Sequence, residues 1–203
     1  MFFTPDARDK KLLPHDPVKA IVVPRPIGWI STVSEEGIAN LAPYSFFNAV
    51  GGVPPIVMFS SEGLKDSARN AVQSGEFVCN FVSRDLEREM NETSTPAPAG
   101  VSEFDHVGIE RGTCNLVAAP RVAAAKAAFE CKVTSVVDII DIHGEKTGAI
   151  TVFGQVVGVH IDEAAISDGR FDLNIAKPVS RLGYLDFGYI DDLHEMPRPR
   201  WEG

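Results

Sequence analysis

The chain has 203 residues, of which 44% are hydrophobic and 23% are charged. This composition is typical of a folded globular protein and disfavours disorder, collagen-like repeats and a fibrous rod. We expect one domain over residues 1–203. Asp and Glu outnumber Lys and Arg by 28 to 19, which gives a net charge of -9 without a long basic stripe, so nucleic acid is not an expected partner.

Membrane and secretory signals are not evident in the sequence. No stretch approaches the roughly 20 apolar residues that cross a bilayer, and the first residues lack the apolar core of a signal peptide. We therefore expect a cytoplasmic protein with no membrane partner.

Cysteine and histidine spacing gives no pattern of metal or disulfide chemistry. Cys79, Cys114 and Cys131 lie far apart and form neither a disulfide framework nor a CxxC pair, so we expect core thiols. The five histidines show no HExxH or HxH spacing, and we predict no metal site. His160, at the end of an apolar strand, is more typical of a hydrogen-bonded histidine at a barrel rim than of a catalytic base.

The first third of the chain is rich in proline, which predicts short strands and loops in place of long helices. Residues 20–23 and 27–33 are predicted strands, and the turn at 35–37 closes a hairpin after the second of them. Residues 56–59 are predicted to form a further buried strand.

The clearest predicted helix covers residues 64–74, with an apolar face that includes Leu64, Ala68, Ala71 and Val72. Asp66 or Ser67 is a suitable N-cap, and Gly75 is a suitable end.

Beyond this helix, residues 77–82 alternate in period two and are a predicted strand. Ser83 can cap a short helix that carries Leu86 and Met90 on one face. Residues 91–102 contain prolines and small polar residues, which are typical of a mobile connection or lid.

The last long elements are two predicted strands, one from residue 127 onward and one over residues 149–161, which pair across a turn at 143–146. Gly154 and Gly158 indicate bends or close backbone approach, as in a small curled barrel. A doubly wound parallel sheet is disfavoured, because neither a GxGxxG nor a GxxxxGK[ST] loop is present and long helices do not alternate with the strands. The pattern predicts a mainly β, antiparallel, barrel-like fold.

The most unusual segment is residues 40–48. Pro43 can fix its backbone so that N–H and C=O groups face a flat heteroaromatic ligand, with Tyr44, Phe46 and Phe47 as walls. The alternative is a proline-bent edge strand with core phenylalanines, and composition by itself favours that alternative.

A second candidate is residues 60–70, where a strand leads into a helix. The positive end of the helix with Lys65, Ser60, Ser61 and Ser67 could hold a phosphate. The alternative is simple helix capping, which the sequence by itself favours.

Two arginines complete the candidate ligand groups. Arg25, near Ser31 and Thr32, could reach a phosphate or a ribityl hydroxyl, or it could be solvated. Arg181 lies in the late segment 177–184, which could close over a bound ring or clasp the end of the chain.

Taken together and in this order, four motifs resemble the flavin reductase-like family, which includes flavoredoxin. The motifs are Arg25-Pro-Ile-Gly-Trp-Ile-Ser-Thr32, Asn40-Leu-Ala-Pro-Tyr-Ser-Phe-Phe-Asn48, Lys65-Asp-Ser-Ala-Arg-Asn70 and Arg181-Leu-Gly183. The resemblance implies an FMN-binding split barrel, which is a Greek-key antiparallel barrel with a few flanking helices. It also implies a homodimer with the flavin near the subunit interface.

The resemblance also assigns site residues by position. The isoalloxazine ring would be lined by Asn40, Leu41, Ala42, Pro43, Tyr44, Ser45 and Phe46. The ribityl phosphate would be held by Thr32, Ser60, Ser61, Lys65, Asp66 and Ser67, and Arg181 would close the site. Ser67 replaces the family's usual threonine and keeps the hydroxyl, whereas Tyr184 replaces a frequent glycine and leaves the shape of the outer site open.

The implied activity is hydride transfer from NAD(P)H to FMN without a catalytic residue from the protein, because the cofactor supplies the reactivity. Reduced FMN would then serve an acceptor such as an oxygenase or an electron-transfer partner. Two alternatives remain open: a non-enzymatic electron carrier that holds FMN tightly, as flavoredoxin does, and a barrel-shaped binding module with a degenerate site.

Overall fold

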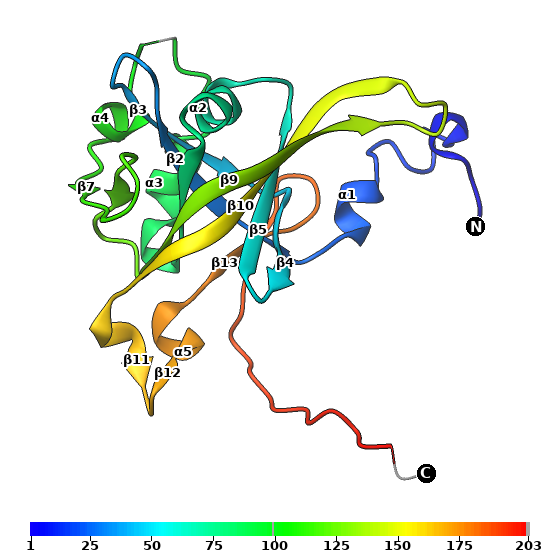
Figure 1. The fold of residues 1–203 in the computed structure, drawn as a ribbon. Helices are drawn as coiled ribbons and strands as arrows, with labels where there is room; N and C mark the ends of the chain where they lie inside the picture. Colours follow the sequence, from blue (N-terminus) through cyan, green and yellow to red (C-terminus); the bar gives the residue numbers. More distant parts are fainter. Residues whose placement is uncertain (99, 202–203) are drawn as a thin grey trace.

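The computed structural model describes residues 1–98 and 100–201, and its largest element is a seven-stranded antiparallel sheet (Figure 1). In sheet order, the strands are β3 (Ala39–Tyr44), β2 (Gly28–Val33), β6 (Glu76–Asn80), β9 (Ala127–Ile140), β10 (Lys146–Ile161), β5 (Pro55–Glu62) and β4 (Phe47–Gly52). The edge strand β3 also contacts β5, which shows that the sheet curls into an open barrel.

Smaller sheets and short helices flank this barrel. One small sheet consists of β1 (Arg25–Pro26), β13 (Val179–Arg181) and β14 (Phe187–Tyr189). A second consists of β7 (Arg111–Gly112) and β8 (Arg121–Val122), and a third of β11 (Ile166–Ser167) and β12 (Arg170–Phe171). The helices are α1 (Val18–Ile21), α2 (Asp66–Ser74), α3 (Glu87–Glu92), α4 (Glu103–Val107) and α5 (Leu173–Ala176), with 3-10 turns at Pro5–Ala7, Arg84–Leu86 and Glu163–Ala165. Among the described residues, every helix is too short or too polar to cross a membrane.

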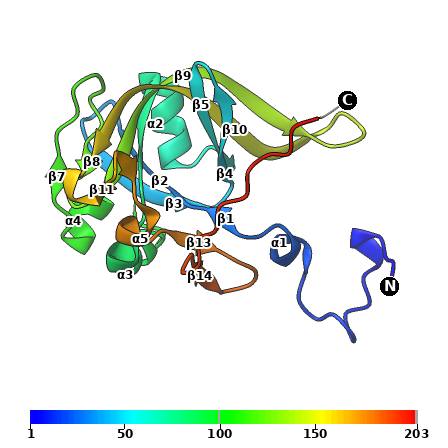
Figure 2. The ribbon, with the colours of Figure 1, turned by 90° about the horizontal axis from the view of Figure 1, so that it is seen from below.

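The core is divided between the two faces of β2, because successive side chains of a strand point to opposite sides. Trp29 packs with Leu41 and with Phe104 of α4 in one buried cluster. Ile30, one residue later, packs with Phe77 in a second buried cluster that includes α2. Figure 2 shows α2 on one side of β2 and β3, and α3 and α4 on the other.

Most predicted strands are confirmed, but the strand predicted over residues 20–23 is wrong. Residues Val18–Ile21 form the helical turn α1, and Ile21 and Val22 are exposed. The apolar β-branched residues that suggested a strand lie outside the main sheet. Strand preference depends on packing against neighbouring strands, and this segment lacks that packing in the described structure.

The predicted helix over residues 64–74 is confirmed, with two corrections. It begins at Asp66, so Lys65 is the N-cap residue in place of the expected Asp66 or Ser67, and it ends at Gly75, whose φ of 72° is left-handed. Ala68 and Ala71 are fully buried, whereas Leu64, which precedes the helix, and Val72 are exposed. The buried face is therefore narrower than the apolar pattern suggested.

The two glycines of β10 mark the expected bends. The register between β10 and β9 shifts between Phe153 and Gly154 and again between Val156 and Gly158. A Cβ at Gly154 would lie 2.5 Å from the ring of Phe77 and 3.1 Å from Cβ of Cys131, so the ring occupies space that a side chain would need.

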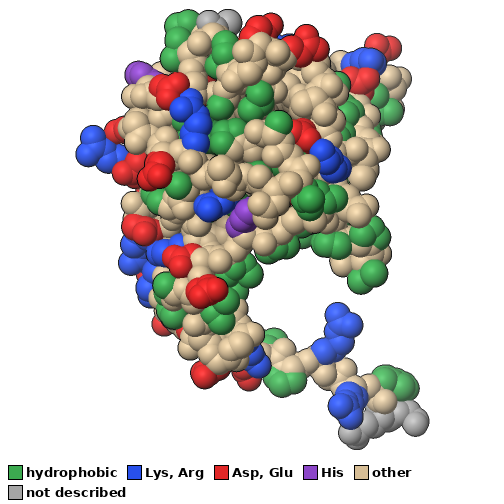
Figure 3. Space-filling model, turned by 60° about the vertical axis from the view of Figure 1, so that its left-hand side comes forward, with side chains coloured by type: hydrophobic (Ala, Val, Ile, Leu, Met, Phe, Trp, Pro, Cys, Tyr) green, Lys and Arg blue, Asp and Glu red, His purple; other side chains and the backbone are tan. Residues whose placement is uncertain are grey.

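One face of the molecular surface shows how charged side chains are distributed. On the face displayed in Figure 3, Lys and Arg side chains are interspersed with Asp and Glu, and apolar side chains lie between them. Figure 1 also shows the β9–β10 hairpin and both terminal segments extending away from the barrel.

We expect Gly154→Ala to lower the free energy of unfolding by about 1–3 kcal/mol, because the added methyl group overpacks the core against Phe77. Urea denaturation measures this loss. Gly52→Ala in β4 is the matched control, since a Cβ there meets nothing within 4 Å among the described residues. Equal unfolding midpoints for the two variants would contradict close packing at Gly154.

Candidate functional site

A buried polar network joins β3 to the beginnings of α2 and α4. The Asn40 amide nitrogen donates to both carboxylate oxygens of Glu103, at 2.9 and 3.1 Å, and the backbone N–H of Leu41 donates to the same carboxylate at 2.9 Å. The Ser67 hydroxyl donates to Asn40 Oδ1 at 2.6 Å. These contacts fix the edge strand and the first turn of α2 relative to each other.

A polar cavity of about 470 Å³ opens beside this network, within the size range of small-molecule sites. Its lining residues are Asn40, Ala42, Pro43, Tyr44, Lys65, Asp66, Ser67, Thr93, Ser94, Thr95, Pro96, Ala97 and Glu103. The structure therefore brings the end of β3 and the start of α2, two separately predicted segments, to the walls of one cavity.

The electrostatics of the cavity suit an anionic group at one end. The first turn of α2 presents backbone N–H groups without intrahelical acceptors, and the exposed Lys65 precedes it. The nearby carboxylate of Asp66 is paired with Arg69, and that of Glu103 is occupied by Asn40 and Leu41. Both negative charges at the cavity are therefore compensated by neighbouring donors.

Tyr44 forms an aromatic wall of the cavity. Its ring lies against Phe59, with ring centroids 4.9 Å apart. Burial raises the pKa of Tyr44, so the phenol stays protonated at neutral pH. Ser61, beside Tyr44 on β5, is buried, and its hydroxyl has no hydrogen-bond partner among the described residues.

Other predicted site residues lie farther from this lining. The Thr32 hydroxyl accepts from the Asn70 amide at 3.2 Å and supports the network, and the Leu41 side chain is in the core. Ser60 donates to the carbonyl of Ile150 at 3.1 Å. Ser45 is half-buried and Phe46 is exposed, and both follow β3 in the turn to β4.

The two predicted arginines hold backbone segments together. Arg25 is buried and donates to the carbonyls of Val22 and Leu182, both at 2.7 Å, and to that of Lys19. Burial, together with the charge of Arg181, lowers the pKa of Arg25.

Arg181 donates to the carbonyl of Tyr184 at 2.5 Å and lies over the ring of Phe187. Tyr184 has a φ of 56°, a backbone region that favours glycine, and its ring is exposed and packs edge-on against His15. The tyrosine therefore replaces glycine without entering the core.

Sequence reasoning missed one wall of the cavity. Residues 93–97 belong to the predicted mobile connection, yet Thr93 is buried and its hydroxyl accepts from Trp29 Nε1 at 2.9 Å and donates to the Met90 carbonyl at 2.7 Å. The run of Ser, Thr and Pro was the only feature of this segment in the sequence that could have indicated a polar cavity wall. Glu103, which organises the network, gave no signal as a lone acidic residue.

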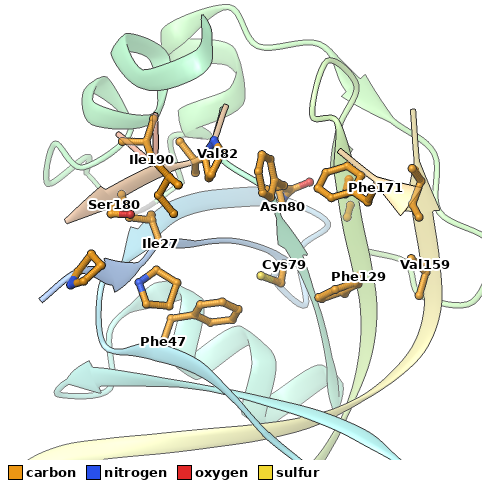
Figure 4. A pocket seen from close by; sticks show the side chains of 18 residues that line it. Ile27, Phe47, Cys79, Asn80, Val82, Phe129, Val159, Phe171, Ser180 and Ile190 are labelled. Carbon is orange, nitrogen blue, oxygen red and sulfur yellow. The ribbon is translucent and has the colours of Figure 1, made fainter. Parts of the chain in front are cut away.

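A second cavity, of about 430 Å³, lies between the main sheet and β13 and has an almost wholly apolar lining. Figure 4 shows Phe47, Phe129 and Phe171 around it, with Cys79 near its centre. Asn80 also lines this cavity, but its side-chain amide is already hydrogen-bonded. Its Nδ2 donates to the Trp29 carbonyl at 2.9 Å, and its Oδ1 accepts the Val122 N–H at 2.7 Å. This lining suits an uncharged apolar group and does not suit a phosphate.

The cysteines do not act as ready nucleophiles. Cys79 and Cys131 are buried, as expected of core thiols, and burial raises the pKa of Cys79 and, to about 12, that of Cys131. Cys114 is half-buried, and burial with the nearby Glu130 raises its pKa to about 11. All three thiols are protonated at neutral pH.

The fold and this cavity define a class: an antiparallel barrel whose edge strand and first long helix form a polar ligand site. The sequence model of the family described as 'Flavin reductase like domain' matches residues 21–178. The chain therefore belongs to the flavin reductase-like family. A relative from Aquifex aeolicus (strain VF5) is 39% identical over 173 residues, covering 82% of this chain and 84% of that protein. YwrF of Bacillus subtilis (strain 168) is 32% identical, covering 88% and 89% of the two chains.

Solved structures confirm the predicted split barrel, because a structure from Shewanella frigidimarina NCIMB 400 that is described as having a split barrel domain superposes with a TM-score of 0.84. Nitrilotriacetate monooxygenase component B from Bacillus cereus superposes with a TM-score of 0.87 and 26% identity, covering 97% of this chain and 98% of that chain. Flavoredoxin of Desulfovibrio vulgaris (Miyazaki F) shares the fold, with a TM-score of 0.77 and 18% identity over 86% and 91% of the two chains. The protein is a mainly β, flavin-related split-barrel protein.

We expect Glu103→Ala to lower the free energy of unfolding by at least about 2 kcal/mol, because the Asn40 amide and the Leu41 N–H would lose a buried acceptor. Asp105→Ala on the same helix removes an exposed carboxylate and is expected to have a much smaller effect. Chemical denaturation compares the two variants. A Glu103→Ala protein as stable as Asp105→Ala would show that the network does not hold β3.

Proposed function

We propose that the protein is an NAD(P)H-dependent FMN oxidoreductase whose single domain spans residues 1–203. The observation that carries this proposal is the convergence of the backbone around Pro43, the Tyr44 wall and the first turn of α2 on one cavity. A flavin mononucleotide has the matching chemistry, because it joins a flat heteroaromatic ring to a phosphate through a polar chain.

In this proposal the chain's own residues bind and orient the cofactor. The backbone of residues 40–45 and the side chain of Phe46 line the isoalloxazine ring, and Tyr44 shields one of its edges from water. Lys65 and the N–H groups that begin α2 hold the phosphate, with Ser67 and Asp66 beside them. The free hydroxyl of Ser61 is a further donor, and Thr32 and Ser60 support these groups from neighbouring strands.

Arg25 and Arg181 act through the backbone in this proposal. Their guanidinium groups contact carbonyls of residues 182, 184 and 185 and so hold the loop that we propose closes the outer side of the site. Tyr184 lies in this loop.

When bound by these residues, FMN would supply the redox chemistry, with NAD(P)H as the hydride donor. The protein needs no acid, base or metal for that step. Its residues exclude water from the ring and fix the face that is open to the nicotinamide. The likeness to nitrilotriacetate monooxygenase component B supports an oxygenase as the partner that uses the reduced flavin.

The proposal includes a homodimer. The β9–β10 hairpin extends beyond the barrel and exposes an apolar series (Figure 1). Its members are Val136, Val137, Ile139, Ile140 and Ile142. A second copy of the chain that packs on this hairpin would remove that surface from water.

We expect purified protein to bind FMN and to oxidise NADH or NADPH only when FMN is present, which an anaerobic absorbance assay measures. We expect Lys65→Ala to raise the Kd for FMN about tenfold, because it removes a cation from the phosphate end of the cavity. The matched control is Lys10→Ala, an exposed lysine of the N-terminal segment that does not line the cavity.

Three measurements, namely nucleotide oxidation, dialysis and a thermal shift, discriminate between the functions. Flavin-dependent oxidation of the nucleotide supports the reductase. Flavin that survives dialysis without nucleotide oxidation supports an electron carrier. A protein without any FMN-induced thermal shift would overturn flavin binding itself.

The dimer has its own test. We expect the double variant Ile140→Glu, Ile142→Glu to sediment as a monomer at concentrations where the unsubstituted protein is a dimer, because the charges would be desolvated at the interface. Val53→Glu, at an exposed aliphatic side chain in the β4–β5 turn, is the control. A double variant that remains a dimer would place the interface elsewhere.

A further inference from the structure

Three potential metal ligands from distant parts of the chain meet outside the polar cavity. Cys114 lies in the loop between β7 and β8, Glu130 lies in β9, and His160 lies in β10. A ligand atom from each side chain lies within 4.8 Å of the other two. None of the three residues lines the polar cavity assigned to FMN.

Glu130 is held in place by the backbone of the loop. Its side chain is 1% exposed. One carboxylate oxygen accepts the N–H of Asn115 at 2.9 Å, and the other accepts those of Leu116 and Val117 at 2.6 and 3.0 Å. Hydrogen-bonded carboxylates of this kind are well suited to metals, because outer-shell donors fix the orientation of the ligand.

The neighbouring strand leaves room for this carboxylate. Gly158 pairs with Glu130, and a Cβ at Gly158 would lie 3.3 Å from the carboxyl carbon of Glu130. His160 follows two residues later on the same face of β10, and its Nε2 lies 2.6 Å from Glu130 Oε1. The side chain of His160 is 22% exposed, which provides a path from solvent to the cluster.

We propose that Cys114, Glu130 and His160 form a binding site for zinc, with three protein ligands and a water molecule in the fourth position. Thiolate, imidazole and carboxylate are the ligands that zinc uses, and this mixture disfavours magnesium and calcium, which prefer oxygen ligands. The thiolate and the carboxylate together neutralise the two positive charges of the ion.

The spacing of the three ligand atoms must adjust when zinc binds. Metal bonds of about 2.0–2.3 Å in a tetrahedron place the ligand atoms about 3.3–3.8 Å apart. His160 Nε2 and Glu130 Oε1 must therefore move apart from 2.6 Å, and Cys114 Sγ, which lies within 4.8 Å of both, must come to the same spacing. The hydrogen that zinc displaces moves to the other ring nitrogen of a neutral His160, or to the solvent if the ring is protonated. Cys114 gives up its proton to the solvent when it binds the metal.

The bound ion would connect the loop between β7 and β8 to both long strands. Glu76 also binds this loop, accepting the Ala118 N–H at 2.5 Å, so the loop is already positioned in the absence of metal. The site is therefore expected to bind zinc in folded protein, independently of FMN.

The test uses full-length protein without a polyhistidine tag, freed of metal by dialysis against a chelator. Zinc is titrated in competition with a chromophoric chelator, and cobalt is titrated as the spectroscopic probe. We expect one equivalent of either metal and, with cobalt, the absorption of a tetrahedral ion together with thiolate-to-metal charge transfer.

Variants identify the ligands. We expect Cys114→Ser to abolish the charge-transfer absorption and His160→Gln to weaken zinc binding at least about tenfold. His106→Gln, at an exposed position of α4, is the control and is expected to bind zinc like the unsubstituted protein. A thermal melt of each variant shows that the barrel is intact.

Several results would overturn the site. They are failure of zinc to compete with the chelator, cobalt absorption without charge transfer, charge transfer that persists in Cys114→Ser, and an equal loss of affinity in His106→Gln. Metal binding and FMN binding are measured separately, so failure of one proposal does not affect the other.

Discussion

The arrangement of the polar cavity depends on one buried carboxylate. Glu103 accepts the side-chain amide of Asn40 and the backbone N–H of Leu41, and Asn40 in turn accepts the hydroxyl of Ser67. Because β3 is an edge strand, the Leu41 N–H would otherwise face away from the sheet without a partner strand. The Glu103 side chain thus accepts an N–H that the edge strand leaves without a partner. Through Asn40 it also aligns α4, β3 and α2, which lie beside the cavity.

The same device recurs at β9. Glu130 accepts three consecutive backbone N–H groups of the loop between β7 and β8, much as Glu103 accepts groups of β3. An ionised carboxylate is stable in a buried position only when hydrogen bonds replace its hydration, and here the backbone supplies them. Glu103 therefore joins α4 to the edge strand β3, and Glu130 joins the loop between β7 and β8 to β9. One anchors the cavity that we assign to FMN, and the other anchors the cluster that we assign to zinc.

The curvature of the barrel determines what these anchored segments can reach. The bulges near Gly154 and Gly158 bend β10 across Phe77 and Glu130, and the edge strand β3 contacts β5 as a result of the overall curl. This closure brings Tyr44 against Phe59 and leaves the start of α2 open at the end of β3. A flat sheet with the same strands would separate these groups.

The sequence alone determined the strands with clear period-two alternation, the hairpins, the helix that ends at Gly75 and the family, because these depend on local periodicity, turn chemistry and ordered motifs. It also indicated Asn40 and Lys65 as members of a ligand site. The tertiary structure alone decided that residues 20–23 form no strand, that residues 93–97 form a wall of the cavity, and that Glu103 organises it. It also brought Cys114, Glu130 and His160 together. Packing partners and hydrogen-bond acceptors from distant parts of the chain govern these features, and the spacing of residues along the chain does not record which strands lie side by side.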